Sequence, residues 1–350
     1  LASAVADLSG SGGNVGRYIT RFVMAGLASM EAEALIRASL LSTVDASLCG
    51  ALVGMASARE LLARIERDSG LVVAIEGGGE NYRLHPLLGE YLRDRARELP
   101  RSTIESVHRT AAEWYAANGR IDEAAEHAFR GGMKASALAW IEARLRLLAS
   151  QGRMAEVLAW LDRLPEQELA SHEGIQLTLA WACTLCCRLD DAHRLIDLIA
   201  ARSTLTSETR RQAEIVRSAI EIHDDDYRSA SLGRLDDDTS LASLYRNSSS
   251  YFAIHAGSPA AARHYQQLSD SSDAPRSHYD EMYGAFAVGL SYLVEGLAAE
   301  AAPVFRRALV RAEATGGRRA VAAALQAAGL AAAAWELGAD DEALSLLAHR

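Results

Sequence analysis

The chain has 350 residues, of which 49% are hydrophobic and only 6 are proline, and its formal net charge at pH 7 is −10. This length allows two ordinary domains or one domain with a repeat array, and the scarcity of proline favours helices. An acidic chain repels phosphate backbones, which argues against unaided binding of nucleic acid. The sequence shows no signal-peptide pattern and no run of about 18 uncharged apolar residues, so we expect a cytoplasmic protein that does not associate with membranes.

Residues 1–16 are rich in glycine and serine, and we expect them to be the remnant of a linker. A chain that begins with such a segment looks cut from a longer protein. Apolar residues at helical spacing follow between positions 18 and 56, where Asp45 marks the start of one helix. Residues 58–67 predict an amphipathic helix whose inward side chains are Leu61, Leu62 and Ile65.

The next stretch predicts a β-hairpin. LVVAIE (71–76) is a short β-branched apolar run, GGGEN (77–81) is a turn, and YRLH (82–85) is a second strand. Pro86 then stands at the first position of a helix, where a proline sacrifices no hydrogen bond. Helix, hairpin and helix together predict a winged-helix domain over residues 17–100.

The wing of this domain does not have the charge of a DNA reader. A winged helix that reads DNA carries basic residues on its wing. Here the tip, GGGEN, offers no cation, and the first hundred residues hold 10 Arg against 12 Asp plus Glu. We therefore expect this domain to be a packing and regulatory unit.

Residues 101–350 carry a repeat in which a small or turn residue is followed, five positions later, by a compact apolar residue. The compact residues are Ala124, Val157, Ala192, Ala230, Ala262, Ala301 and Ala343. A spacing of about 34 residues, with drift, is typical of tetratricopeptide-like (TPR-like) helical hairpins. One hairpin cannot cover its own apolar face, so neighbours must stack. The expected fold class is mainly α: a winged-helix domain followed by an α-α superhelical TPR-like array with a concave groove.

No catalytic or metal-binding constellation stands out. Nothing matches Gly-x4-Gly-Lys-Ser/Thr, so the chain cannot hydrolyse ATP by that mechanism, and we expect no enzymatic activity. CTLCC places Cys183, Cys186 and Cys187 on one helical face, but a structural zinc needs four ligands, and buried thiols are the simpler interpretation. The acidic runs HDDD (223–226) and DDD (236–238) are typical of helix starts.

The groove of the repeats is the remaining candidate site. The repeat register places five side chains toward its concave side: Trp181, Tyr251, His255, Tyr283 and Phe286. Aromatic faces with a few polar neighbours suit a small ligand or an extended peptide. The alternative is that these residues pack between repeats.

The segment around residue 85 resembles a known family. LHPLLGEYL is similar to the end of the winged-helix domain in the STAND class of signal-transduction ATPases. With RASLLSTVDASLCGALVG before it and HRTAAEWYAANGRIDEAAEHA after it, the chain resembles the MalT-type large ATP-binding regulators of the LuxR family, from about residue 18 to beyond Trp160. The resemblance implies that His85 contacts the β-phosphate of ADP in the full-length protein. The alternative is that His85 only caps a strand end and bonds to the backbone.

The same resemblance implies cofactors and partners outside this chain. ATP or ADP would bind an upstream ATPase module, and DNA would bind a C-terminal helix-turn-helix that follows the repeats. The repeats would bind a small inducer or a regulatory protein, and the activated protein would self-associate. The expected function is therefore the effector-sensing and regulatory portion of an ATP-dependent transcriptional activator. The alternative is a free-standing TPR-type protein–protein interaction module without nucleotide dependence.

Overall fold

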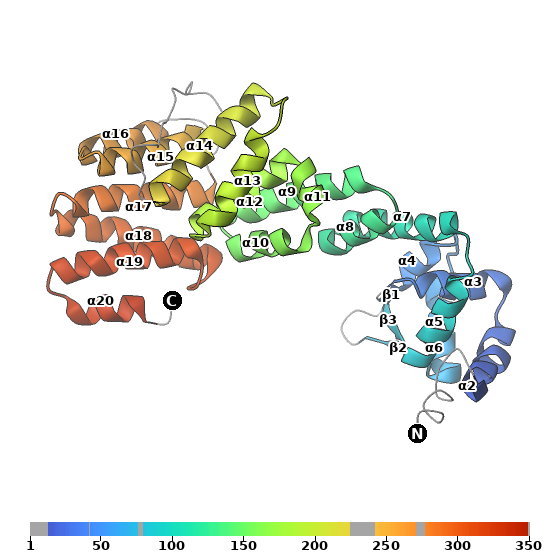
Figure 1. Cartoon of the computed structure of the whole chain (residues 1–350). Coiled ribbons are helices and arrows are strands. Elements are labelled where there is room, and N and C mark those ends of the chain that lie inside the picture. Colours follow the sequence, from blue (N-terminus) through green and yellow to red (C-terminus); the bar gives the residue numbers. More distant parts are fainter. Residues whose placement is uncertain (1–12, 42, 76–79, 225–241, 271–276, 349–350) are drawn as a thin grey trace. The chain divides into compact units, whose positions relative to one another are not determined.

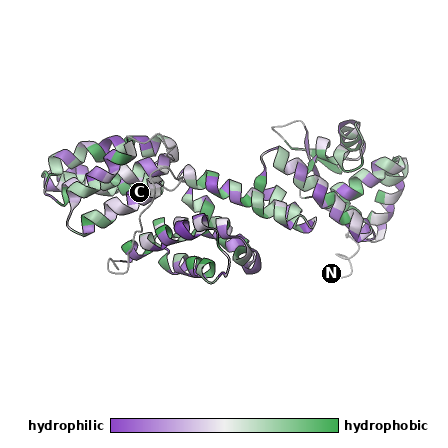
Figure 2. Cartoon of the chain, turned by 90° about the horizontal axis from the view of Figure 1, so that it is seen from above, coloured by the Kyte–Doolittle hydropathy of each residue, from purple (hydrophilic) through white to green (hydrophobic). Residues whose placement is uncertain are grey.

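The structure is a computed structural model that describes residues 13–41, 43–75, 80–224, 242–270 and 277–348 (Figure 1). It divides the chain into two compact units, Leu1–Ile141 and Glu142–Arg350. Hydrophobic and hydrophilic residues alternate along the helices of both units, as expected for amphipathic helices with one buried face (Figure 2). Over the described residues, no helix has the length and apolarity that a bilayer crossing requires.

The first unit contains a winged helix. Its elements are α2 (Gly13–Tyr18), η1 (Ile19–Val23), η2 (Met24–Gly26), α3 (Ser29–Ala38), β1 (Val44–Asp45), α4 (Ala46–Ala51), α5 (Ala58–Ser69), β2 (Val72–Ala74), β3 (Asn81–Leu84) and α6 (Pro86–Ala96). The predicted hairpin is confirmed, because β2 and β3 pair antiparallel with Val72 opposite Leu84. The sequence did not predict β1, which pairs with the other edge of β3 and completes a three-stranded sheet of order β1-β3-β2.

The core of the winged helix gathers large apolar side chains. Leu61, Leu62 and Ile65 of α5 are buried, as the amphipathic pattern predicted. The same cluster continues into the first helical hairpin, α7 (Arg101–Ala117) and α8 (Ile121–Arg130), through Val107, Ala111, Tyr115 and Ala124. The winged helix and its first following hairpin therefore share one core. The boundary at residues 100/101 stays a prediction.

The last residues of the expected linker, 13–16, are helical. Residues 1–12 lie outside the described part of the chain, but α2 begins at Gly13. Gly16 is buried in this helix, and Ile19 immediately after it is 1% exposed in the winged-helix core. Packing of the following residues thus draws a glycine-containing segment into a helix that its local propensity does not favour.

The helices of the second unit follow a helix α9 (Lys134–Ser150) that spans the boundary between the units. They are α10 (Met154–Arg163), α11 (Glu166–Ser171), α12 (Glu173–Leu185), α13 (Leu189–Ala200), α14 (Ser207–His223), α15 (Ala242–His255), α16 (Pro259–Asp270), α17 (His278–Leu293), α18 (Ala298–Gly316), α19 (Val321–Glu336) and α20 (Asp340–Leu347). The pairs α12/α13, α15/α16, α17/α18 and α19/α20 pack as neighbours, and α17 also packs on α15 and α19 (Figure 1). The predicted array of helical hairpins is therefore confirmed for these four pairs and for α7/α8. The short α11 is an addition that the repeat pattern did not contain.

The turns between paired helices explain the repeat pattern. Gly257, Gly296 and Gly338 have φ of +76°, +75° and +75°, a region that glycine enters without strain. Cys187 has φ of +55° at the equivalent turn between α12 and α13. The compact residue five positions after each described turn is buried, which lets the two helices approach closely. The instance that begins at Asp225 and places Ala230 as its compact residue lies outside the described residues.

Candidate functional site

Helix α14 contributes side chains to two pockets on its opposite faces. Ala219, Ile222 and His223 line one pocket, whereas Arg210, Ala213, Glu214 and Arg217 line the other. Successive residues of an α-helix are about 100° apart around its axis, which places the two groups on opposite sides of α14. We call them the aromatic pocket and the arginine pocket.

The aromatic pocket brings together three of the five residues predicted for the groove. Trp181 comes from α12, Tyr251 from α15 and Tyr283 from α17. The complete lining is Trp181, Ala219, Ile222, His223, Asn247, Ser248, Tyr251 and Tyr283. Its cavity volume is about 20 Å³, which is room for about one water molecule.

Tyr251 is the central side chain of this pocket. Its ring lies 6.2 Å from the ring of Tyr283 and 6.1 Å from that of Phe286, on which it stacks. Its hydroxyl is buried and has no hydrogen-bond partner among the described residues. Burial, with a smaller effect of Tyr283, raises the pKa of Tyr251 well above its usual value. A buried phenol normally has a partner, so this hydroxyl is an unused donor and acceptor.

Asn247, a polar neighbour of Tyr251 in this pocket, already has hydrogen-bond partners within the protein. The Oδ1 atom of Asn247 accepts from Gln266 at 3.0 Å, and its Nδ2 atom donates to the carbonyl of Asp280 at 3.0 Å. Asn247 is therefore already used within the protein. The sequence analysis missed Asn247 and Ser248, although the polar run NSSS (247–250) within a helix was a visible signal.

The other two predicted groove residues do not line the aromatic pocket. Phe286 packs between Tyr251 and Phe305, whose ring centre lies 5.6 Å away. His255 is exposed in the last turn of α15. The register could not give the depth at which each side chain lies, and the role of these residues in ligand binding stays a prediction.

The arginine pocket lies between α13 and α14 and was not predicted. Its volume is about 220 Å³, and it is lined by Ile196, Ala200, Arg202, Leu205, Arg210, Ala213, Glu214 and Arg217. The spacing of Arg210 and Arg217, seven residues apart on one helix, was the available signal. The loop that brings Arg202 to the same pocket had no such signal.

His85 occupies the position where the hairpin turns into α6. It is the N-cap of that helix, and its Nδ1 atom accepts a hydrogen bond from the backbone N–H of Leu87 at 3.3 Å. The residue is exposed. Since Nδ1 is an acceptor in this arrangement, a neutral ring carries its proton on Nε2. His85 therefore caps α6, whereas the alternative expectation placed it as the cap of a strand end that bonds to the backbone, and it also presents a donor to solvent. Its contact with a nucleotide stays a prediction.

The thiols and acids that the sequence singled out do not form a centre in the described structure. Burial raises the pKa of the Cys183 thiol to about 12, so this thiol stays protonated at neutral pH. Cys186 is partly buried and Cys187 is exposed. Among the described residues, no three His, Cys, Asp or Glu side chains lie close enough together to hold a metal ion. Residues 225–226 and 236–238 of the acidic runs are outside the described part.

Comparisons with known proteins find similarity over parts of this chain. Residues 20–104 match the family model of the MalT winged helix domain. The HTH-type transcriptional regulator MalT of Klebsiella pneumoniae is 33% identical over 98 residues, which are 28% of this chain and 11% of that protein. The serine/threonine-protein kinase PknK of Mycobacterium tuberculosis is 27% identical over 225 residues, 62% of this chain and 20% of the kinase.

A solved structure shares the fold. The STAND protein with a tetratricopeptide repeat sensor from Pyrococcus horikoshii aligns with a TM-score of 0.60 and 14% identity, and the match covers 96% of this chain and 52% of that one. The chain thus spans a fifth or less of the length of these curated relatives and about half of the structural neighbour.

Proposed function

We propose that this chain, which carries a MalT winged helix domain followed by TPR-like helical hairpins of the STAND sensor kind, is the effector-sensing and regulatory portion of an ATP-dependent, MalT-like transcriptional activator of the LuxR family. An ATPase module and a DNA-binding helix-turn-helix belong to the full-length protein in this proposal. The chain itself has no catalytic role. It works in the cytoplasm.

The observation that carries the sensing role is the meeting of three helices at the aromatic pocket. Trp181, Tyr251 and Tyr283 come from α12, α15 and α17. The buried hydroxyl of Tyr251 has no hydrogen-bond partner among the described residues. A ligand hydroxyl or carbonyl would satisfy that hydroxyl while its carbon skeleton packs on the rings. A small inducer is therefore the effector that this pocket favours.

The small volume of the pocket means that a ligand can bind only after a conformational change. With a volume of about 20 Å³, it holds no molecule larger than water in the present conformation. Binding of an inducer requires α14 to shift or the aromatic side chains to change rotamer. A ligand that binds only the opened conformation moves the equilibrium toward it, and this is the form that effector control takes in a two-state regulator.

His85 has the nucleotide-contacting role in this proposal. Its exposed position at the N-terminus of α6 leaves the Nε2 atom free to donate to a phosphate oxygen of ADP held by the ATPase module. In the full-length protein, His85→Ala should accelerate ADP release. The helix retains its proline at the first position, although the backbone N–H of Leu87 loses the acceptor that His85 provides.

A second candidate function, docking of a regulatory protein, is favoured by apolar side chains of the last hairpin. Trp335 and Leu337 at the end of α19, together with Leu344 and Leu347 of α20, are all more than half exposed. Exposed apolar groups gathered on one hairpin are typical of protein-binding surfaces.

The two candidates separate in a ligand screen. We expect a metabolite library to contain compounds that raise the Tm of the chain, and Tyr251→Phe to weaken the best of them roughly 2- to 10-fold because one hydrogen bond is lost. Tyr265→Phe, on the neighbouring α16, is the matched control and should leave affinity unchanged. Equal affinity in wild type, Tyr251→Phe and a folded Trp181→Ala variant would remove the aromatic pocket from the proposal.

A further inference from the structure

The arginine pocket has an unusual charge for this chain. Arg202, Arg210 and Arg217 line it, and Glu214 is the one carboxylate in its lining. The whole chain carries a formal net charge of −10, so most of its surface repels anions. The lining itself carries three guanidinium groups and one carboxylate, while Glu173 and Asp197, outside the lining, pair with Arg202 and Arg217.

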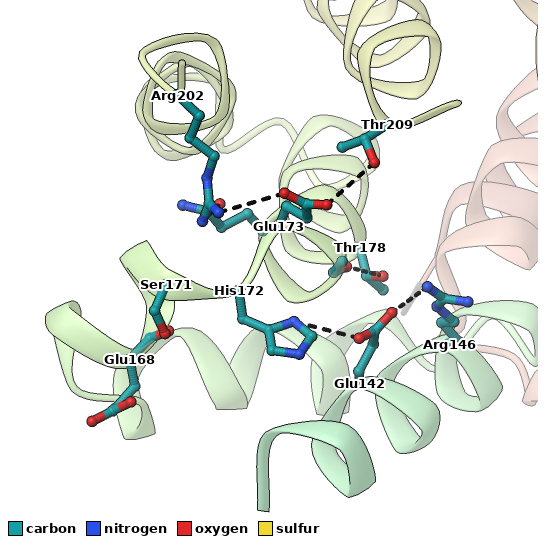
Figure 3. Close-up of polar contacts among 11 residues, drawn as sticks. Glu142, Arg146, Glu168, Ser171, His172, Glu173, Thr178, Arg202 and Thr209 are labelled. Carbon is teal, nitrogen blue, oxygen red and sulfur yellow. Dashed lines mark hydrogen bonds and ion pairs between the residues drawn. The ribbon is translucent and has the colours of Figure 1, made fainter. Parts of the chain in front are cut away.

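Arg202 is fixed in place by groups outside the pocket (Figure 3). Its Nη2 atom donates to the carbonyl of Ala170 at 2.6 Å and to Oε1 of Gln176 at 3.0 Å, and its Nη1 atom donates to Glu173 at 3.5 Å. The hydroxyl of Thr209 donates to the other oxygen of Glu173 at 3.3 Å and ties the start of α14 to the start of α12. These bonds leave the Nε atom of Arg202 buried without a partner among the described residues.

The two arginines of α14 are bound less firmly. Arg217 donates to Oδ1 of Asp197 at 2.9 Å, but the Asp197 side chain is 66% exposed, and such surface pairs contribute little. Arg210 is exposed, and its guanidinium has no ion-pair or hydrogen-bond partner in the described structure. Two guanidinium groups on one face of α14 are thus available to a ligand.

The apolar part of the lining limits the kind of ligand. Ile196, Ala200, Leu205 and Ala213 form the rest of the pocket, so a ligand would place carbon atoms against them. The volume of about 220 Å³ is large enough for a small organic acid of a few carbon atoms. Guanidinium groups bind carboxylate and phosphate oxygens in bidentate fashion.

We propose that the arginine pocket, which Arg202 also lines, binds a small organic anion through a phosphate or carboxylate group held by Arg210 and Arg217. This site is distinct from the aromatic pocket and does not depend on it. Because the same helix α14 lines both pockets, an anion bound here contacts one of the elements whose movement would open the aromatic pocket to an inducer.

Calorimetric titration of the whole chain with glycerol 3-phosphate, succinate and uncharged glycerol tests the proposal. We expect one of the two anions to bind and glycerol not to bind, and the anion that binds identifies phosphate or carboxylate as the recognised group. Arg210→Gln and Arg217→Gln should each weaken that anion about 10-fold or more, as expected for a charge-assisted hydrogen bond. Glu214→Gln should tighten it, because the carboxylate that repels the anion is removed.

Arg211→Gln is the matched control. It removes the same charge one residue along α14, about 100° away from Arg210, and Arg211 does not line the pocket. Far-ultraviolet circular dichroism and Tm confirm that each variant is folded. Absence of binding by both anions at tens of millimolar would overturn the proposal, and so would an equal loss of affinity in Arg211→Gln and Arg210→Gln, which would indicate general surface attraction.

Discussion

The winged helix and the C-terminal hairpins α15–α20 bury their interiors with different side chains. The winged-helix core contains fully buried leucines, among them Leu35, Leu48, Leu62, Leu88 and Leu92. In α18 and α19 the buried residues are mainly alanine, and Phe305 is the largest fully buried side chain among the described residues of the C-terminal hairpins. Helices separated by alanines lie closer together than helices separated by leucines.

Close approach has a second consequence in the C-terminal hairpins, which is the burial of polar side chains. Gln266 donates to Oδ1 of Asn247 at 3.0 Å and to Oγ of Ser250 at 2.8 Å, and Gln326 donates to the carbonyl of Met282 at 2.7 Å. A buried amide is tolerated when its donors are satisfied, and backbone carbonyls are within reach only where helices are close. The comparison teaches that the repeats are specified by small and polar residues, whereas the winged helix is specified by large apolar ones.

Phe305→Ala should produce the largest loss of stability. The ring fills the space between Gly289 of α17 and Gly329 of α19, where an added Cβ atom would lie 2.5 Å and 2.4 Å from ring atoms. Removal of a buried phenylalanine costs about 3–5 kcal/mol. Denaturant unfolding should show this loss, and hydrogen exchange should place it in α17–α19. Val310→Ala in the same helix is the control, since Val310 is 65% exposed and its loss should change stability by less than about 0.5 kcal/mol.

If the alanine-rich interface can collapse into the space left by the ring, the contrast between the repeats and the winged helix is wrong. In that case Phe305→Ala would cost no more than about 1 kcal/mol, the effect of an average substitution. Gly329→Ala gives the opposite perturbation, because its new methyl group overlaps the ring, and overpacking of this kind costs about 1–3 kcal/mol.

The second prediction concerns pH and distinguishes the first unit from the C-terminal hairpins. The Nδ1 atoms of His108 and His127 lie 2.8 Å apart inside the α7/α8 hairpin. Burial lowers the pKa of both residues, and Arg130 and, for His127, His108 add to this lowering, against opposing effects of Glu126 on His108 and of Glu123 on His127. Together these effects lower the pKa of His127 to about 4. The folded pair therefore binds fewer protons than the unfolded chain, and its contribution to stability is complete above about pH 6.5 and is lost as the pH falls toward 4.

Hydrogen exchange, corrected for the intrinsic rate, should thus show α7 and α8 losing protection between pH 7 and pH 5. Protection of α15–α18 should change less, because the amide and hydroxyl groups buried there do not titrate. His127→Gln should flatten the pH dependence, and His193→Gln, which alters a half-exposed histidine, should not. Equal loss of protection in both regions would contradict the distinction.

The same comparison explains what the sequence could predict. Large apolar residues at helical spacing, such as Leu61, Leu62 and Ile65, identify a buried face without further information. The hairpin and the proline at the start of α6 follow equally from local signals. Strand β1 does not, because its two residues are defined by pairing with Tyr82 and Asn81, more than thirty positions away.

The candidate sites were predictable to a different extent. The repeat register identified Trp181, Tyr251 and Tyr283, which three separate helices bring to one pocket. The register also assigned His255 to this face. It could not show that His255 lies outside the pocket, because a register gives the direction of a side chain and not its distance from the pocket. The arginine pocket depends on how the loop after α13 returns Arg202 toward α14, a geometry that no local pattern encodes. Small turn residues predicted the hairpins, yet the positive φ of Cys187 shows that this position tolerates a residue other than glycine.

Gln266→Ala should destabilise the C-terminal hairpins by about 1–3 kcal/mol, the penalty for leaving buried polar partners unsatisfied. Both Asn247 and Ser250 lose their donor in this variant. Gln266→Glu is the informative companion, because it preserves shape but replaces the donor with an acceptor. If the hydrogen bonds of Gln266 do not contribute to stability, the urea midpoints of both variants will equal that of wild type. If polar burial specifies this region, Gln266→Glu will be at least as damaging as Gln266→Ala.

The smallest expected effect lies in the winged helix, at a polar side chain that caps the end of one helix. One carboxylate oxygen of Asp45 accepts from the backbone N–H groups of Ser47 and Leu48, at 2.8 Å and 3.1 Å, and so caps α4 directly after β1. Asp45→Ala should cost about 1 kcal/mol and Asp45→Asn much less, because asparagine also caps. The denaturant midpoint of each variant measures its loss of stability, and hydrogen exchange shows whether the loss is local to α4. A loss of several kcal/mol in Asp45→Ala would mean that this buried carboxylate helps to specify the core, as polar groups do in the repeats, and the contrast between the two regions would disappear.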